Sequence, residues 1–199
     1  MPIDFSSVPV FSGRYSHLKY AANEVNFQGH HLEFGVHAGA TLNFLAASFS
    51  ETKWWGFDSF EGLPERWNRS ADGKRHSEKG DFAIAKPPRI EPNAELVIGF
   101  FEDVLNTWMQ QNPGHISFIH IDSDLYSSAK TILWTLNDRI VEGTIIVFDE
   151  LRDWSEQGVY ELWRSGEWKA LDEWIVERGR EIEPLARTDW IEGSIRVKR

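Results

Sequence analysis

The sequence contains no cysteine among its 199 residues, and it has no long apolar run. Without cysteine the chain can form neither a disulfide nor a thiolate metal site, so its redox compartment cannot be read from the composition. No segment approaches the ~18 consecutive apolar residues that a membrane-spanning helix needs. Residues 1–14 also lack the basic flank and apolar stretch of a secretory signal. We therefore expect a soluble, cytoplasmic protein with no membrane partner.

Positive charge is also scarce. The chain has 21 Lys and Arg against 31 Asp and Glu, which gives a formal net charge of -10. This balance argues against a nucleic-acid partner, because such a partner must be held by neutralising its phosphates. A small anionic ligand is not excluded, since one helix N-terminus is enough to bind it.

The apolar residues that are present suffice for one sizeable core. The chain is 41% hydrophobic and includes 10 tryptophans, which we expect mainly to pack in the interior. At roughly 150 residues per domain, the length predicts a single domain over residues 1–199. Residues 1–30 form a short N-terminal segment. Residues 59–92 are rich in charge, glycine and proline, which is typical of a lid or binding loop.

Short strand patterns alternate with helical patterns along the chain. Such alternation predicts an α/β doubly wound fold with a parallel sheet, closed by a hairpin in the C-terminal tail. The expected strands are 31–36, 53–58, 95–99, 116–121, 144–148, 181–187 and 194–198. The expected helices are 41–49, 102–111, 129–140 and 168–175. Ligands of this fold class bind beyond the carboxyl ends of the strands.

A glycine-containing turn follows the first of these strands. Residues 33–39 (EFGVHAG) run from the strand into a helix, so the backbone can approach a ligand and the helix N-terminus can face an anion. Asp58 ends the second strand about twenty residues later, where an acid commonly binds a ribose diol. Together these features favour a nucleoside-type ligand. The alternative for Asp58 is a cap of the turn 59–62.

Four carboxylates follow two further strands, Asp122 and Asp124 after one and Asp149 and Glu150 after the other. Neighbouring parallel strands lie ~4.8 Å apart, so these side chains should meet at one rim of the sheet. Crowded carboxylates raise each other's pKa unless a cation neutralises them. Because all the ligands are oxygens, Mg²⁺, Ca²⁺ or Mn²⁺ is favoured over zinc or copper. The alternative is a set of caps and surface ion pairs.

These segments resemble those of a known family. The turn 33–39 is similar to the first motif of class I S-adenosylmethionine (SAM)-dependent methyltransferases. Residues 56–64 (GFDSFEGLP) resemble the signature of the macrocin O-methyltransferase (TylF-like) family, which methylates sugar or phenolic hydroxyls of natural products. Residues 99–103 (GFFED) and 120–128 (HIDSDLYSS) resemble later segments of that family in the same order. The resemblance covers roughly residues 30–150.

The resemblance implies a Rossmann-like methyltransferase with a seven-stranded sheet and helices on both of its faces. It also implies that SAM is the cofactor and that the first two motifs bind it, with the ribose at Asp58. The cofactor-binding residues carried over in this way are Glu33, Gly35, Gly39, Thr41, Asp58 and Ser59.

The same resemblance implies a Mg²⁺ site at Asp122, Asp149 and Glu150, and a general base at Asp124. Family members usually have two aspartates after the strand that corresponds to 144–148. Here the second of these residues is Glu150, whose side chain is one CH₂ longer. The implied activity is methyl transfer to a hydroxyl of a sugar or small natural product. A hydroxyl bound to a divalent cation has a lowered pKa, and a nearby carboxylate can take its proton.

No motif identifies the acceptor, the methylated position or the oligomeric state. The segment 1–30 is shorter than the N-terminal lid helices that family members often carry. Three arrangements of the acceptor pocket therefore stay open. The pocket is open to solvent, built by residues 59–92, or completed by a second subunit of a homo-oligomer.

Two functions of other classes also fit parts of the pattern. Residues 122–124 form a D-x-D, which binds a metal and a sugar nucleotide in some glycosyltransferases, but this leaves the glycine turn and Asp58 unexplained. A non-catalytic SAM-binding or interaction module would fit an incomplete acceptor site. The cephalosporin hydroxylase-like proteins, which are similar in sequence to the TylF-like family, are a further alternative.

Overall fold

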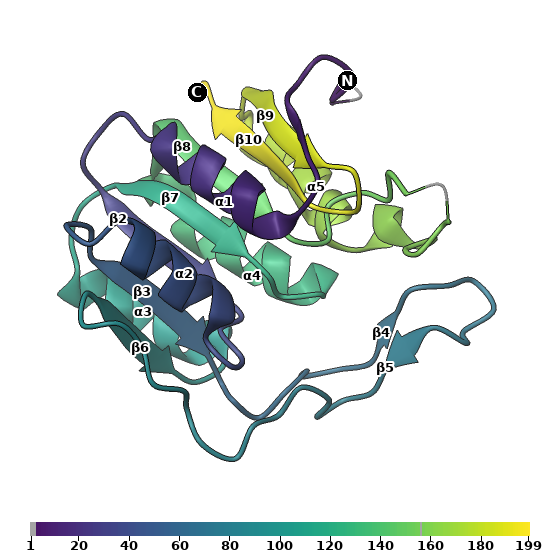
Figure 1. Cartoon of the computed structure of the whole chain (residues 1–199), viewed down its shortest axis with the longest axis horizontal. Coiled ribbons are helices and arrows are strands. Elements are labelled where there is room, and N and C mark those ends of the chain that lie inside the picture. The colour runs from purple at the N-terminus through teal and green to yellow at the C-terminus, as the bar shows by residue number, and fades with distance from the viewer. Residues whose placement is uncertain (1–2, 156) are drawn as a thin grey trace.

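The computed structural model describes residues 3–155 and 157–199 and is built around one large twisted sheet (Figure 1). Within those residues the sheet has eight strands in the order β1-β9-β10-β8-β7-β2-β3-β6. The five strands from β8 to β6 are parallel, and β10 is antiparallel to both of its neighbours. The strands are β1 (Val10–Phe11), β2 (His30–Phe34), β3 (Trp54–Asp58), β6 (Ala94–Ile98), β7 (Ile116–Ile121), β8 (Ile140–Phe148), β9 (Ile182–Thr188) and β10 (Gly193–Val197).

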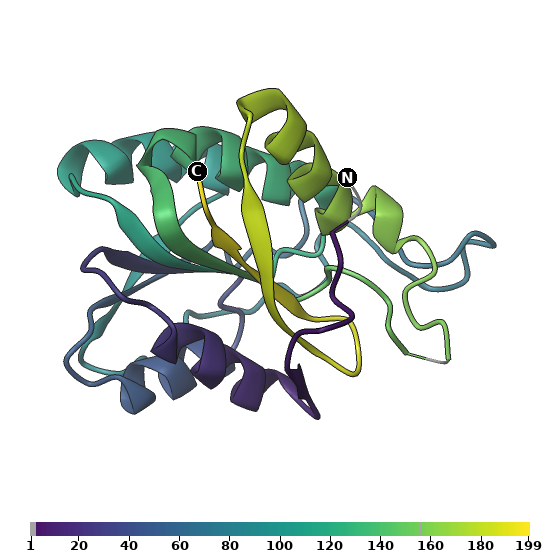
Figure 2. The same cartoon turned by 90° about the horizontal axis from the view of Figure 1, so that it is seen from above.

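Helices cover both faces of this sheet, as Figure 2 shows from above. Helices α1 and α2 lie on one face, and α3, α4 and α5 lie on the other. None of the helices in the described ranges combines the length and apolar character required to cross a lipid bilayer. The helices are α1 (Arg14–Asn23), α2 (Ala40–Ser48), α3 (Phe101–Gln111), α4 (Tyr126–Leu136) and α5 (Glu167–Arg178).

The sheet separates two hydrophobic cores. Leu42 and Leu45 of α2 pack with Trp54 on one face, whereas Trp108 of α3 and Trp174 of α5 belong to the core on the other face. All six residues of β7 are buried, because this central strand has a helix layer on each side. The α/β doubly wound fold expected from the sequence is thereby confirmed.

The strand order also defines a switch point. From β2 the chain builds outward through β3 and β6, and it then returns to the other side of β2 to form β7 and β8. Connections on the two sides of β2 therefore diverge, which leaves a crevice beyond the carboxyl ends of β2 and β7.

The structure departs from the sequence prediction at three places. The sheet has an eighth strand, β1, which is only two residues long and pairs with β9. Helix α1 was not predicted, because Leu18 is its only large buried apolar residue. The predicted helix 129–140 ends at Leu136, and Ile140 already begins β8. A two-residue pattern, or a helix with one large apolar anchor, carries too little periodicity to be recognised.

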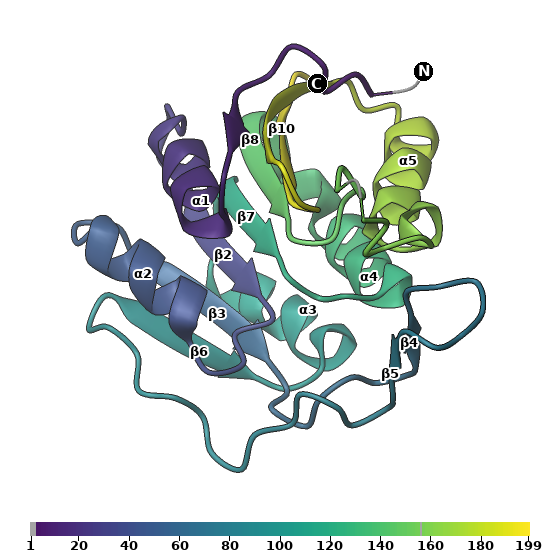
Figure 3. The same ribbon diagram turned by 45° about the vertical axis from the view of Figure 1, so that its right-hand side comes forward.

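The loop 59–92 is not wholly irregular. It forms a small hairpin from β4 (Trp67–Asn68) and β5 (His76–Ser77), which lies apart from the large sheet in Figure 3. The Trp67 indole donates to the Tyr160 hydroxyl at 3.4 Å, and the Ala71 N–H donates to the Glu161 carboxylate at 2.9 Å. These contacts fasten the hairpin to the segment that precedes α5.

Gly35 is the glycine on which the meeting of β2 and β7 depends. Its φ is +91°, and a Cβ at this position would overlap the carbonyl oxygen of Asp122. The Asp122 N–H donates to the Phe34 carbonyl at 2.8 Å, so the two strands continue to pair to their last residues. A side chain at position 35 would force these strand ends apart.

Gly35→Ala is therefore expected to destabilise the protein by about 3 kcal/mol or more, from backbone strain and overlap together. Gly73→Ala is the matched control, because Gly73 also has a positive φ (+70°) but nothing lies within 4 Å of its added Cβ. It should cost about 1 kcal/mol, the strain alone. Urea unfolding of both variants measures the difference, and equal losses would contradict the argument.

Candidate functional site

A cavity of about 300 Å³ opens at the carboxyl ends of β2, β3 and β7, where the topology predicts a ligand. Its wall comes from segments far apart in the sequence, including α1, the turn after β2, the loop 59–92 and the start of α3. Several of its wall residues were singled out from the sequence, and they are Gly35, Thr41, Asp58, Ser59, Asp122 and Asp124.

Asp58 fixes the shape of the glycine turn. Its Oδ2 accepts hydrogen bonds from the Val36 N–H at 2.8 Å and the His37 N–H at 2.7 Å. Its Oδ1 accepts from the Phe60 N–H at 2.7 Å, so the alternative role as a cap of the following turn is also real. A carboxylate has about four acceptor sites, and Asp58 uses three of them here, so it keeps capacity for one further donor.

Four of the predicted site residues do not line the cavity. Glu33 is fully buried, and Asp149 and Glu150 are 1% and 5% exposed. Gly39 is the N-cap of α2, with φ +77°, and a Cβ there would meet the Pro88 side chain at 3.1 Å. Glu33 and Gly39 therefore reach the cavity only through their neighbours.

Glu33 connects the glycine turn to the centre of the sheet. Its Oε1 accepts the Thr41 hydroxyl at 3.0 Å, and its Oε2 lies 3.0 Å from Nδ1 of His120. Burial alone would lower the pKa of His120, but its contacts with Asp149 and Glu33 outweigh burial and raise that pKa to about 10. His120 is therefore a buried imidazolium that pairs with carboxylates on both neighbouring strands.

The four carboxylates predicted to converge do so. One oxygen from each of Asp122, Asp124 and Glu150 lies within 4.8 Å of the others, and Asp122 and Asp149 form a second such group with His120. Burial, followed by repulsion from Asp149, raises the pKa of Asp122 and of Glu150 well above the usual range of a carboxyl group. The same causes raise the pKa of Asp124 to about 7.

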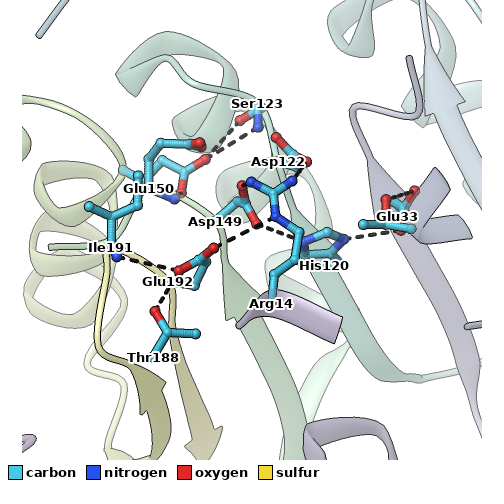
Figure 4. A network of polar contacts seen from close by, with 12 residues as sticks. Arg14, Glu33, His120, Asp122, Ser123, Asp149, Glu150, Thr188, Ile191 and Glu192 are labelled. Atoms are coloured by element: carbon cyan, nitrogen blue, oxygen red, sulfur yellow. Dashed lines mark hydrogen bonds and ion pairs between the residues drawn. The ribbon is translucent and has the colours of Figure 1, made fainter. Parts of the chain in front are cut away.

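Among the four carboxylates, Asp149 has the shortest contact with a positive partner. Arg14, at the start of α1, lies 2.7 Å from Asp149 and 3.6 Å from Asp122 and Glu192 (Figure 4). Although burial works against ionisation, the contacts with His120 and Arg14 lower the pKa of Asp149 below its usual value. Arg14 and Asp149 thus form an ion pair at the edge of the cavity.

The donor set fits a divalent cation. Oε2 of Glu150 is buried and has no hydrogen-bond partner among the described residues. The three clustered carboxylates offer oxygen ligands from two adjacent strand ends, with Asp124 held at a positive φ of 62°. A buried carboxylate oxygen without a donor is costly unless a cation or proton satisfies it.

Sequence reasoning missed three charged residues around this cluster. Arg14 and Glu192 lie outside the motifs, and nothing in the sequence placed them near the strand ends. Glu167 is fully buried beside the acids, and it lies beyond residues 30–150, which carry the family resemblance. Their positions depend on tertiary packing, so local spacing could not predict them.

Comparisons with known proteins bear on this site. The family model described as macrocin-O-methyltransferase (TylF) matches residues 10–166. No protein of curated function is detectably similar to the chain in sequence. The crystal structure of CalS11, a calicheamicin methyltransferase, aligns with a TM-score of 0.68 at 20% identity over 92% of this chain and 77% of its own. The O-methyltransferase NovP aligns with a TM-score of 0.64 at 19% identity over 93% and 79%.

Glu33→Gln tests the buried ion pair. The amide of glutamine is uncharged, so the substitution leaves the His120 imidazolium without one of its two counter-charges. In addition, only one end of the amide can accept a hydrogen bond. We expect a loss of about 3–5 kcal/mol in unfolding free energy, measured by urea titration. Glu95→Gln removes an exposed carboxylate paired with Lys53 and should cost about 0–1 kcal/mol. If the Glu33 variant were as mild as this control, the pairing with His120 would not matter for folding.

Proposed function

Because the chain belongs to the macrocin O-methyltransferase (TylF) family, we propose that it transfers a methyl group from SAM to a hydroxyl of a sugar or other small natural product with the help of Mg²⁺. One observation carries the proposal. A single cavity is lined both by the glycine turn with Asp58 and by Asp122 with Asp124. A methyl donor and an activated hydroxyl can therefore lie side by side, and such proximity is the main requirement of this displacement.

SAM would occupy the part of the cavity that the glycine turn and Asp58 line. Asp58 would accept hydrogen bonds from the ribose beside Ser59, while Gly35 and Thr41 would border the methionine end. The free N–H groups at the start of α2 suit the methionine carboxylate. Glu33 and Gly39 would contribute indirectly, since Glu33 holds the Thr41 hydroxyl and Gly39 begins the helix. Bound SAM supplies an electrophilic methyl group on a sulfonium.

Mg²⁺ would be held by Asp122, Glu150 and Asp149. Asp122 and Glu150 belong with Asp124 to the closely spaced group of oxygens. Asp149 would offer Oδ1, which also lies 3.7 Å from Nε2 of His120, since Arg14 contacts Oδ2. The cation would supply Lewis acidity that lowers the pKa of an acceptor hydroxyl.

Asp124 would act as the general base. It lines the cavity, whereas Asp149 and Glu150 do not. Its raised pKa of about 7 is close to the value at which a carboxylate both accepts a proton readily and is substantially ionised near neutral pH.

The acceptor would lie under the loop 59–92 and α1. Leu63, Pro64 and Phe82 of the loop line the cavity together with Arg14 and Tyr15 of α1. The short N-terminal segment thus takes part in the pocket, and we assign residues 59–92 as its lid. CalS11 is described as a TDP-rhamnose 3'-O-methyltransferase, which favours a sugar among the acceptors to be screened first. The family match favours methyl transfer over the glycosyltransferase alternative.

Calorimetric titration with SAM, and with its demethylated product SAH, tests the methyl-donor site. Both should bind with micromolar affinity, and Asp58→Asn should weaken this about 10- to 100-fold through loss of charge-assisted hydrogen bonds. Glu51→Gln removes a carboxylate before β3, at the opposite end of that strand, and should leave affinity unchanged. A protein that binds neither compound is not a SAM-dependent enzyme.

Two asparagine variants separate the roles of the acids. Asp122→Asn should abolish Mg²⁺-dependent turnover while SAM affinity is kept, because a ligand oxygen is lost on the acceptor side only. Asp124→Asn should reduce turnover on the order of 10²- to 10⁴-fold with little change in metal affinity. Steady-state rates over a Mg²⁺ series measure both effects. An unchanged rate in Asp124→Asn would remove this residue as the base.

A further inference from the structure

Glu167 joins the two chain segments that carry the acids. Its Oε1 accepts the Ser123 N–H at 3.3 Å and the Ser123 hydroxyl at 3.4 Å, and its Oε2 accepts the Glu150 N–H at 3.1 Å. Ser123 stands between Asp122 and Asp124, and Glu150 follows Asp149. One carboxylate therefore bridges the segment after β7 and the segment after β8.

This bridge begins where the sheet stops. The last backbone hydrogen bond between these segments is donated by the Asp149 N–H to the Ile121 carbonyl at 2.9 Å. Beyond this hydrogen bond the two segments are no longer paired strands, so backbone hydrogen bonds do not set their separation. Glu167, which is fully buried, takes over this role by binding one side with each of its oxygens.

The start of α5 holds Glu167 in place. Glu167 is the first residue of the helix, where a negative side chain is favoured by the helix dipole. A Cβ on the preceding Gly166 would overlap the hydroxyl of Tyr160. Only glycine at this position therefore lets the helix begin beside Tyr160. Tyr160 is itself buried, and it receives the hydrogen bond of Trp67 from the hairpin.

Burying an ionised carboxylate at position 167 is energetically unfavourable. Glu167 is fully buried and its charge is repelled by Asp149 and Asp124, whereas its two backbone N–H donors stabilise that charge. A neutral side chain of similar size could fill the space without this repulsion. Only a carboxylate, however, offers an acceptor oxygen to both segments at once.

We propose that Glu167 is a positioning residue, which holds residues 122–124 and 149–150 at the separation that brings the oxygens of Asp122, Asp124 and Glu150 within 4.8 Å. It touches neither substrate nor cation, and it acts through the backbone of its two partners. The inference rests on the proposed function, because the spacing matters only if these oxygens bind a cation.

Glu167→Gln is the sharpest variant. It keeps the size of the side chain but replaces one acceptor oxygen by an NH₂ group. That NH₂ group cannot accept a hydrogen bond from a backbone N–H, so one half of the bridge is lost. Glu167→Asp keeps the charge and shortens the side chain by one CH₂, so that it cannot span both partners. Glu177→Gln is the matched control, since Glu177 is an exposed carboxylate on the same helix.

Mn²⁺ uptake by the full-length protein, followed by the electron paramagnetic resonance signal of free Mn²⁺, measures the effect. Glu167→Gln and Glu167→Asp should each weaken Mn²⁺ binding at least tenfold, while SAM affinity in calorimetry stays within twofold of the wild type. Glu177→Gln should change neither. Thermal melting of each variant, recorded before titration, shows whether it is folded.

Mn²⁺ affinity within twofold of the wild type in folded Glu167→Gln would overturn the inference and leave the proposed function intact. Equal losses of Mn²⁺ and SAM affinity would also overturn it, because they would reveal a general disturbance of the fold. A wild-type protein that takes up no Mn²⁺ would contradict the proposed metal site and this inference together.

Discussion

The rest of the site depends on the buried contact of His120 with Glu33 and Asp149. His120 lies on β7, between a carboxylate on β2 and one at the end of β8, and both side chains of its ion pair with Glu33 are inaccessible to solvent. Breaking a buried pair by removing one partner is strongly destabilising, so each group requires the others. Through Thr41 at one end and Arg14 at the other, this chain of contacts links the start of α2 to the start of α1.

This arrangement explains how one small cavity can serve two different ligands. The glycine turn is shaped by Asp58 from one side and tied through Thr41 and Glu33 to the imidazolium from the other. Asp122 and Asp149 lie next to the same imidazolium. Under the proposed function, this buried framework would set the distance between the methyl donor and the acceptor hydroxyl, which is what an in-line transfer demands.

The sequence sufficed for the features that depend on local pattern. Asp58, Asp122 and Asp149 each follow an apolar strand, and parallel strands necessarily bring such residues to one edge. The sequence alone did not reveal the side-chain positions that depend on tertiary packing. Arg14 reaches the acids because α1 lies over the sheet, yet α1 has too weak an apolar stripe to be predicted. Glu33 was expected at the cofactor, but its side chain is buried and contacts Thr41 and His120. Glu167 lies 44 positions from Ser123 and 17 positions from Glu150, so no spacing rule reveals the bridge that it forms.

The proposed function requires the methyl donor and a divalent cation to share the cavity at the carboxyl ends of β2, β3 and β7. A crystal structure of the protein with SAH and Mn²⁺, recorded with anomalous diffraction at the manganese edge, would locate both ligands. We expect the SAH ribose within hydrogen-bond distance of Asp58 and an anomalous peak between Asp122 and Glu150. SAH bound away from the glycine turn, or manganese bound away from these carboxylates, would contradict it.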